Sequence, residues 1–216
     1  MISAVCIRQS IRFTWLLPGL MLILLANPAT ADEYQLENGG FYGYYNPPLP
    51  LPQLYDWEHY SYSDRGAAWS ALDIDDQPDS GSAAMHFSFE GNGGTGMVLY
   101  QCVKRDPNAS HVHYGASALV DEEESNGVGA HIKVRMFKND DCTGTSSLGG
   151  EGDINWGSNE WRGVSNSFAL NSETQSIKIS LGIRKLPNAG SDGLVHFDNV
   201  WLEQEVLPLF DDRFEK

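Results

Sequence analysis

The segment Gly193–Glu203 constrains the fold most, because its apolar residues alternate, are interrupted once and then resume. Val195 and Phe197 share one face of an extended strand, and after the polar step Asp198-Asn199 the pattern restarts at Val200. A change of phase of this kind is typical of a β-bulge at one of the two polar residues. We therefore expect the closing strand of a β-sandwich.

Alternating runs of this kind recur along the chain and are separated by turn-forming residues. No stretch shows a sustained helical period with caps. The sequence therefore predicts an all-β protein, an antiparallel β-sandwich of jelly-roll type. The clearest predicted strands are Ala83–Phe89, Met97–Val103, His111–Val120, His131–Phe137, Ser176–Ile183 and Leu194–Leu202.

The first 31 residues have the pattern of a secretory signal peptide. Arg8 and Arg12 precede an apolar run, and the small residues Ala29-Thr30-Ala31 suggest cleavage before Asp32. No second long apolar run follows, so we expect no membrane span and an exported protein, periplasmic or extracellular. The remainder divides into a Pro/Tyr-rich segment (32–52), one sandwich domain (53–205) and a tail (206–216).

The mature chain is strongly acidic. It keeps 12 of the 14 basic side chains, since Arg8 and Arg12 are removed, against 29 acidic ones, for a formal charge of −17. Duplex nucleic acid is an unsuitable partner because binding to its backbone needs a basic face. The acidity favours solubility outside the cell, with surface calcium as the alternative.

Two cysteines survive maturation, Cys102 and Cys142. An even pair in an exported protein is typical of a disulfide, and neither cysteine has a Cys or His at metal-ligand spacing. We expect the two to be bonded.

Alternation also assigns strand faces. Apolar residues on the strands containing Val112, Ile132 and Ile177 should build the core, while the opposite faces carry basic side chains. If these strands are neighbours, their outward faces form a cationic patch. Its predicted members are His113, Lys133, Arg135, Lys178 and Arg184.

The order of several short motifs resembles the jelly-roll carbohydrate-binding modules of the family 4/9 type, from about residue 36 to 203. The motifs are Asn38-Gly39-Gly40-Phe41, Trp57, Trp69–Asp73, Tyr100–Val103, the strand from Val112 to Val120, Trp161 before a strand at Phe168, and Phe197–Val200. The resemblance implies a non-catalytic glycan-binding domain in which sugar rings stack on aromatic side chains.

The resemblance also has departures. Ser117 stands where such modules often carry a tryptophan, which leaves Trp156, on a predicted Gly/Asn-rich loop, and Trp161 as candidate stacking residues; both are equally consistent with structural, buried tryptophans. Tyr42, Tyr44 and Tyr45 could form a stacking platform, although a role in covering the sandwich edge is favoured.

Modules of this family often hold a structural calcium ion, and Asp198 matches one ligand by motif. However, Tyr42 replaces a carboxylate that often follows the opening phenylalanine. The competing interpretation is that Asp198 accepts hydrogen bonds from backbone amides at the bulge.

Catalytic motifs are absent: there is no Gly-x-Ser-x-Gly elbow, His-Glu-x-x-His helix or phosphate-binding loop. His111 and His113 could share a zinc ion with His131, but paired histidines on a strand are more often solvated. We expect a binding protein rather than an enzyme, with a carbohydrate ligand, for which the basic residues favour an anionic polysaccharide. The alternative is a structural or adhesive envelope protein with no glycan ligand.

Overall fold

The computed structural model describes residues 35–42, 54, 56–60, 67–76, 80–86, 94–121, 127–187 and 193–206, all within the unit that spans Asp32–Lys216. The predicted signal peptide, Tyr44, Tyr45 and all but the first residue of the predicted tail lie outside the described residues. The described residues form strands and connections, with no helix among them.

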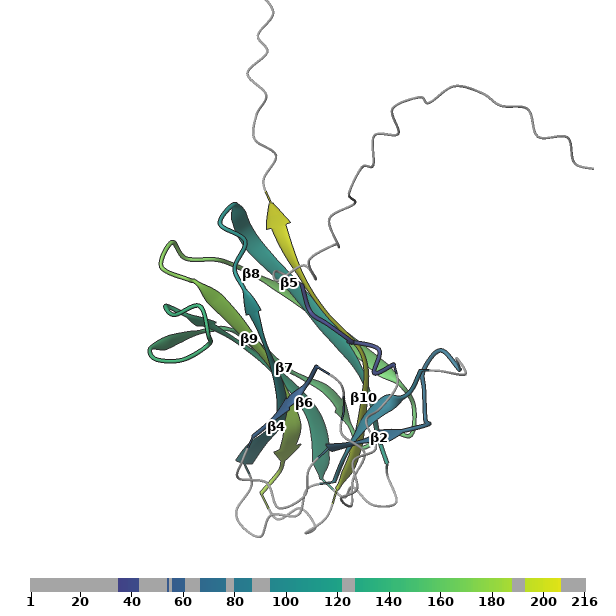
Figure 1. The fold of residues 1–216 in the computed structure, drawn as a ribbon. Coiled ribbons are helices and arrows are strands. Elements are labelled where there is room, and N and C mark those ends of the chain that lie inside the picture. Colours follow the sequence, from purple (N-terminus) through teal and green to yellow (C-terminus); the bar gives the residue numbers. More distant parts are fainter. Residues whose placement is uncertain are drawn as a thin grey trace, which may run out of the picture. The chain divides into compact units, whose positions relative to one another are not determined.

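Two antiparallel five-stranded sheets pack as a jelly-roll sandwich (Figure 1). One, which we name the β9 sheet after its central strand, has the order β1(Glu58–His59), β4(Gly94–Lys104), β9(Ser176–Lys185), β6(Val128–Phe137), β7(Ser146–Trp156). The other, the β10 sheet, has the order β2(Ala67–Ser70), β3(Ser82–His86), β10(Leu194–Val206), β5(Ala109–Val120), β8(Arg162–Ala169).

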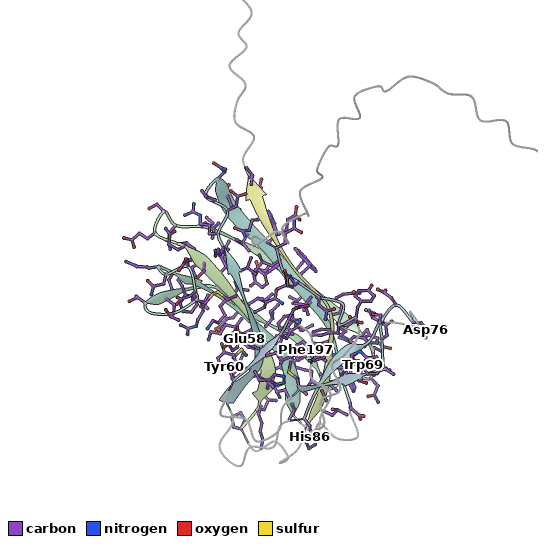
Figure 2. All side chains as sticks on the ribbon, in the orientation of Figure 1. Glu58, Tyr60, Trp69, Asp76, His86 and Phe197 are labelled. Atoms are coloured by element: carbon purple, nitrogen blue, oxygen red, sulfur yellow. A yellow bond between two sulfur atoms is a disulfide. The ribbon has the colours of Figure 1, made fainter. Side chains whose placement is uncertain are left out.

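All six predicted strands are present, although the end of the first, beyond His86, lies outside the described residues. For the four strands whose faces were predicted, the inward faces are the predicted ones, since alternation places every second side chain between the sheets. Figure 2 shows Glu58 and Tyr60 on the side of the sandwich away from Trp69 and Asp76. Fully buried core residues include Val112, Ala118, Ile132, Val134, Ile177, Ile179, Leu181, Ile183, Val195 and Phe197.

The predicted bulge in β10 is confirmed. The register with β5 shifts between Asp198 and Trp201, and Asn199 has a positive φ of 46°. The extra residue lets Phe197 and Val200 both face the core, and it turns Trp201 outward, where its ring lies over Gly115.

The two ends of the motif series meet in space. The Val200 amide donates to the Gly39 carbonyl at 2.9 Å, and a Cβ on Gly39 would collide with the Val200 carbonyl. Glycine is therefore required where the opening turn crosses the closing strand, and this crossing buries Phe41.

Strand β7 corrects the prediction of a Gly/Asn-rich loop around Trp156. Glycines weaken a strand pattern in sequence, but here they make room for the core. A Cβ on Gly149 would lie 2.6 Å from the Phe168 ring, and one on Gly150 would collide with Tyr114 Oη. The Phe168 and Tyr114 rings can approach the β7 backbone closely because these two positions are glycines.

Candidate functional site: the outward face of the β9 sheet

Four of the five predicted basic residues lie together. Lys133 and Arg135 on β6 face outward beside Lys178 and Arg184 on β9, because the register pairs Arg135 with Lys178 and Lys133 with Ser180. Strands β6 and β9 are neighbours in the sheet even though two strands separate them in the chain.

His113 is the exception and corrects the predicted patch. It lies on β5 in the β10 sheet, so it faces outward on the opposite side of the sandwich. Alternation predicted its outward orientation correctly, but the sheet to which its strand belongs depends on long-range pairing.

Carboxylates offset two of these cations. Lys133 Nζ lies 3.0 Å from Glu151 Oε2, and Arg184 Nη1 lies 3.1 Å from Asp153 Oδ2. The hydrogen bond from Lys133 lowers the pKa of Glu151, so this group is ionised at neutral pH. Arg135 donates to Ser146 Oγ at 3.0 Å.

His131 belongs to the same network, although its side chain is almost fully buried. Its Nδ1 is 2.8 Å from Asp153 Oδ1, and its Nε2 is 3.9 Å from Glu151 Oε2. His131, predicted on an outward strand face, is therefore a buried group between two carboxylates on β7.

Aromatic rings occupy the β1–β4 side of this face. Tyr60 and Tyr100 have ring centroids 4.6 Å apart, and Tyr60 Oη shares a 3.1 Å hydrogen bond with Ser180 Oγ. The ammonium of Lys178 lies 4.4 Å from the Tyr100 centroid and 5.2 Å from that of Phe137, within range of cation–π attraction.

Burial and acidic neighbours shift the pKa values of Tyr100 and Lys178. The Tyr100 hydroxyl donates a hydrogen bond to Glu58 Oε2, and this bond raises the pKa of Tyr100 to about 12. Burial lowers the pKa of Lys178, while Glu58 and Asp141 act in the opposite direction.

Trp156 adds a partly exposed ring at the far edge of the sheet. It lies on β7, and a Cβ on its partner Gly129 would be 2.7 Å from the indole. Trp161, in contrast, directly precedes β8 of the β10 sheet. Only Trp156 of the two candidate tryptophans therefore belongs to the face that holds the basic residues.

We call this surface the polar-aromatic face. Five strands at about 4.8 Å spacing make it about 19 Å wide. Its members are Glu58, Tyr60, Tyr100, His131, Lys133, Arg135, Glu151, Asp153, Trp156, Lys178, Ser180 and Arg184.

An acidic cavity of about 330 Å³ adjoins the polar-aromatic face at the β1–β4 edge and shares Glu58 with it. Lys104 is its basic lining residue. The carboxylates of Glu37, Asp56, Glu58 and Asp140 line it together with Gln35, Gln101 and Cys102.

Cys102 and Cys142 form the predicted disulfide. It ties the β6–β7 connection to strand β4 beside this cavity. Within that connection, the Cys142 amide donates to Ser176 Oγ at 3.0 Å, and Ser176 Oγ donates to the Asn139 carbonyl at 2.6 Å. The connection is therefore anchored both covalently and by hydrogen bonds.

Asp198, the predicted calcium ligand, is fully buried at the bulge and away from the polar-aromatic face. Its carboxylate accepts from the amides of Ile74 at 3.1 Å and Asn199 at 2.6 Å, so the amide-capping role is present. Burial, followed by a hydrogen bond with Asp73, raises the pKa of Asp198 to about 7.

In the described ranges no group of three His, Cys, Asp or Glu side chains is placed to hold a metal ion. The same ranges contain no helix long and apolar enough to cross a membrane.

Sequence reasoning missed the aromatic half of this face. Tyr100 lies at an outward position of a predicted strand, and its alternation with Leu99 and Gln101 was the available signal. Tyr60 follows the two-residue strand β1, which is too short for a periodic pattern.

No protein-family model matches the chain, and no curated protein matches it in sequence. Among solved structures, a putative sugar binding protein from Bacteroides thetaiotaomicron is 9% identical with a TM-score of 0.51, over 79% of this chain and 99% of that one. The enzymatically active domain of bacteriophage CBA120 tailspike protein 4 is 12% identical with a TM-score of 0.51, over 70% of this chain.

The chain spans only 20% of the tailspike chain. TmCBM61, solved with β-1,4-galactotriose, is 15% identical with a TM-score of 0.46, over 81% of this chain and 97% of that one. At these identities the likeness concerns the fold, which this chain shares with a putative sugar binding protein. Function must be argued from the site itself.

Proposed function

We propose that the polar-aromatic face binds a carbohydrate chain without catalysing its cleavage. The observation that carries this proposal is the Tyr60–Tyr100 pair, which lies beside a row of hydrogen-bonding side chains on the same sheet. Sugar rings offer apolar C–H faces that pack on aromatic rings, while their hydroxyls need polar partners at the edges.

The arrangement of the face supports a chain rather than a single sugar. Tyr60 follows the edge strand β1, Tyr100 lies on the adjacent β4, and Trp156 lies on the opposite edge strand β7. Four strand spacings, about 19 Å, separate the two edges. Lys133, Arg135 and Arg184 lie between them and donate hydrogen bonds. A bound glycan crossing the strands would meet an aromatic ring at each end.

The ion pairs favour an uncharged glycan over the anionic polysaccharide expected from sequence. Glu151 and Asp153 compensate Lys133 and Arg184, and the neighbouring cavity adds further negative charge. An anionic chain would meet little net positive potential here. Binding to a neutral glycan should also be insensitive to salt, since screening weakens only charge–charge attraction.

Retention of residues 32–216 on immobilised neutral and acidic polysaccharides tests the proposal. Tyr100→Ala should weaken binding to the retained glycan at least tenfold, whereas Trp201→Ala, which removes an exposed ring from the opposite sheet, should not. No retention on any glycan, or equal loss in both variants, would contradict it. The structural or adhesive alternative would then be preferred.

We propose export with cleavage before Asp32, which N-terminal sequencing of the secreted protein tests. The absence of catalysis is tested separately by incubation with the retained polysaccharide. Neither reducing ends nor unsaturated products should appear, and their appearance would identify an enzyme.

We also propose a structural calcium ion at Asp198. The donor set supports this in part, because Asp198 and Asp73 bring two carboxyl groups together in a buried site, and hard oxygen ligands suit calcium. Backbone carbonyls and water would have to complete the shell. Calcium would supply positive charge in place of the proton that the two carboxyl groups share.

Thermal unfolding with and without calcium tests this site, since an ion that binds only the folded state must stabilise it. Calcium should raise the Tm of the wild type and leave Asp198→Asn unchanged. An equal shift in both proteins would place the ion elsewhere, and no shift would leave Asp198 with its amide-capping role alone.

A further inference from the structure

A second group of metal-binding side chains lies on the outward face of the β10 sheet, on the other side of the sandwich from the polar-aromatic face. His111 and His113 are two residues apart on β5 and therefore point the same way. Strand register places Glu205 opposite His111 and Glu203 opposite His113. A His-x-His pair thus faces a Glu-x-Glu pair, which we name the His–Glu quartet.

Glu205 already links the two histidines. Its Oε2 lies 3.8 Å from His111 Nδ1 and 3.3 Å from His113 Nε2. The three side chains are between 42% and 48% exposed, so solvent reaches their donor atoms. Ser110 Oγ, 3.1 Å from His111 Nδ1, is a further polar neighbour.

We propose that the His–Glu quartet binds one divalent transition-metal ion of the zinc class, Zn²⁺, Cu²⁺ or Ni²⁺. Two imidazole nitrogens and a carboxylate oxygen suit these borderline ions, and a site with three protein ligands leaves positions open for water or another ligand. Glu203, opposite His113 in the register, would be the fourth ligand.

The geometry needs only a local change. Metal bonds of about 2 Å place neighbouring ligand atoms roughly 3 to 3.5 Å apart in a tetrahedral shell, close to the present His–Glu distances. In the described structure no three of these side chains stand in position to hold a metal ion, because both histidines contact the same Glu205 oxygen. If these exposed side chains rotate, an ion can lie between the histidine nitrogens and the Glu205 carboxylate. The hydrogen bond between Ser110 Oγ and His111 Nδ1 would then break.

The His–Glu quartet differs in its third ligand from the zinc site of His111, His113 and His131 considered from the sequence. His131 cannot join His111 and His113, because it is buried in the β9 sheet between Asp153 and Glu151. The third ligand comes instead from the closing strand, and Figure 1 shows the C-terminal end of β10 running beside β5.

Calorimetric titration of tag-free residues 32–216 with Zn²⁺, in excess calcium to occupy sites made of oxygen atoms, tests the proposal. The wild type should bind one ion per chain. The double variant His111→Ala/His113→Ala should bind at least tenfold more weakly, and Glu205→Gln should show an intermediate loss. The control His59→Ala removes an exposed histidine of the other sheet and should bind as the wild type does.

Thermal unfolding in chelator shows that each variant is folded, as expected for exposed positions. Electron paramagnetic resonance with Cu²⁺ gives a second readout, because two imidazole ligands produce nitrogen coupling that the double variant must lose. No uptake by the wild type, or uptake by the double variant with unchanged affinity and coupling, would overturn the site.

Discussion

The ammonium group of Lys178 lies 4.4 Å from the centre of the Tyr100 ring. Phe137 flanks the same ammonium from β6, and Glu58 on β1 accepts a hydrogen bond from the Tyr100 hydroxyl. Four strands of one sheet thus hold a single aromatic ring in place. The polar-aromatic face is therefore preorganised at its tyrosine end.

Replacement of Lys178 should loosen that ring. For Lys178→Gln we expect glycan binding to weaken about fivefold. The cation–π attraction stabilises the observed orientation of the Tyr100 ring by about 1 kcal/mol, and the variant loses this stabilisation. Isothermal titration with a retained oligosaccharide measures the effect. The control is Lys138→Gln, which breaks only the exposed Lys138–Glu173 pair. Unchanged affinity in Lys178→Gln would show that the lysine does not organise the site.

The Asp198 carboxyl should make stability depend on pH. In calcium-free solution the folded state keeps its proton up to about pH 7, while the unfolded state releases it near the ordinary pKa of 3.8. The folded state therefore binds more protons between these values, so this contribution to the free energy of unfolding falls as pH rises through the window.

The variant Asp198→Asn cannot titrate and should lack this fall. Tm measured from pH 4 to pH 7 in chelator gives the comparison, in which the difference between wild type and variant changes with pH. Parallel curves would show that the carboxyl has an ordinary pKa in the folded protein.

Gly150→Ala should destabilise the fold by about 1–3 kcal/mol, because the new methyl group collides with Tyr114 Oη in the core. Gly152→Ala on the same strand is the matched control, since nothing lies within 4 Å of its Cβ position. Urea unfolding measures both. In a double-mutant cycle, Tyr114→Phe should recover part of the loss at Gly150, and additive effects would refute the contact.

Removal of the disulfide should lower stability by about 4 kcal/mol. The bond closes a loop with a sequence separation of 40, and the chain-entropy model predicts this magnitude for the added freedom of the unfolded chain. Urea unfolding of Cys102→Ala/Cys142→Ala under non-reducing conditions checks it. A loss below about 1 kcal/mol would mean that the anchored β6–β7 connection is held mainly by its hydrogen bonds.

Local patterns predicted the elements that have a clear period. The alternation in Leu194–Leu202 identified the closing strand, its buried face and its bulge, because side-chain direction in a strand depends only on position along that strand. The Cys102–Cys142 bond followed from compartment and cysteine count. Strand β7 was missed because its glycines make room for the Tyr114 and Phe168 rings of the other sheet. Those residues are distant from β7 in sequence.

The sequence alone therefore determined the class of fold, the inward faces of four strands and the disulfide. Only the tertiary structure decided which outward residues share a face. It separated His113 from Lys133, joined Tyr60 and Tyr100 to Lys178, and placed Glu205 against His111. In a jelly roll, neighbouring strands are seldom consecutive, so each face is set by long-range pairing that no local pattern records.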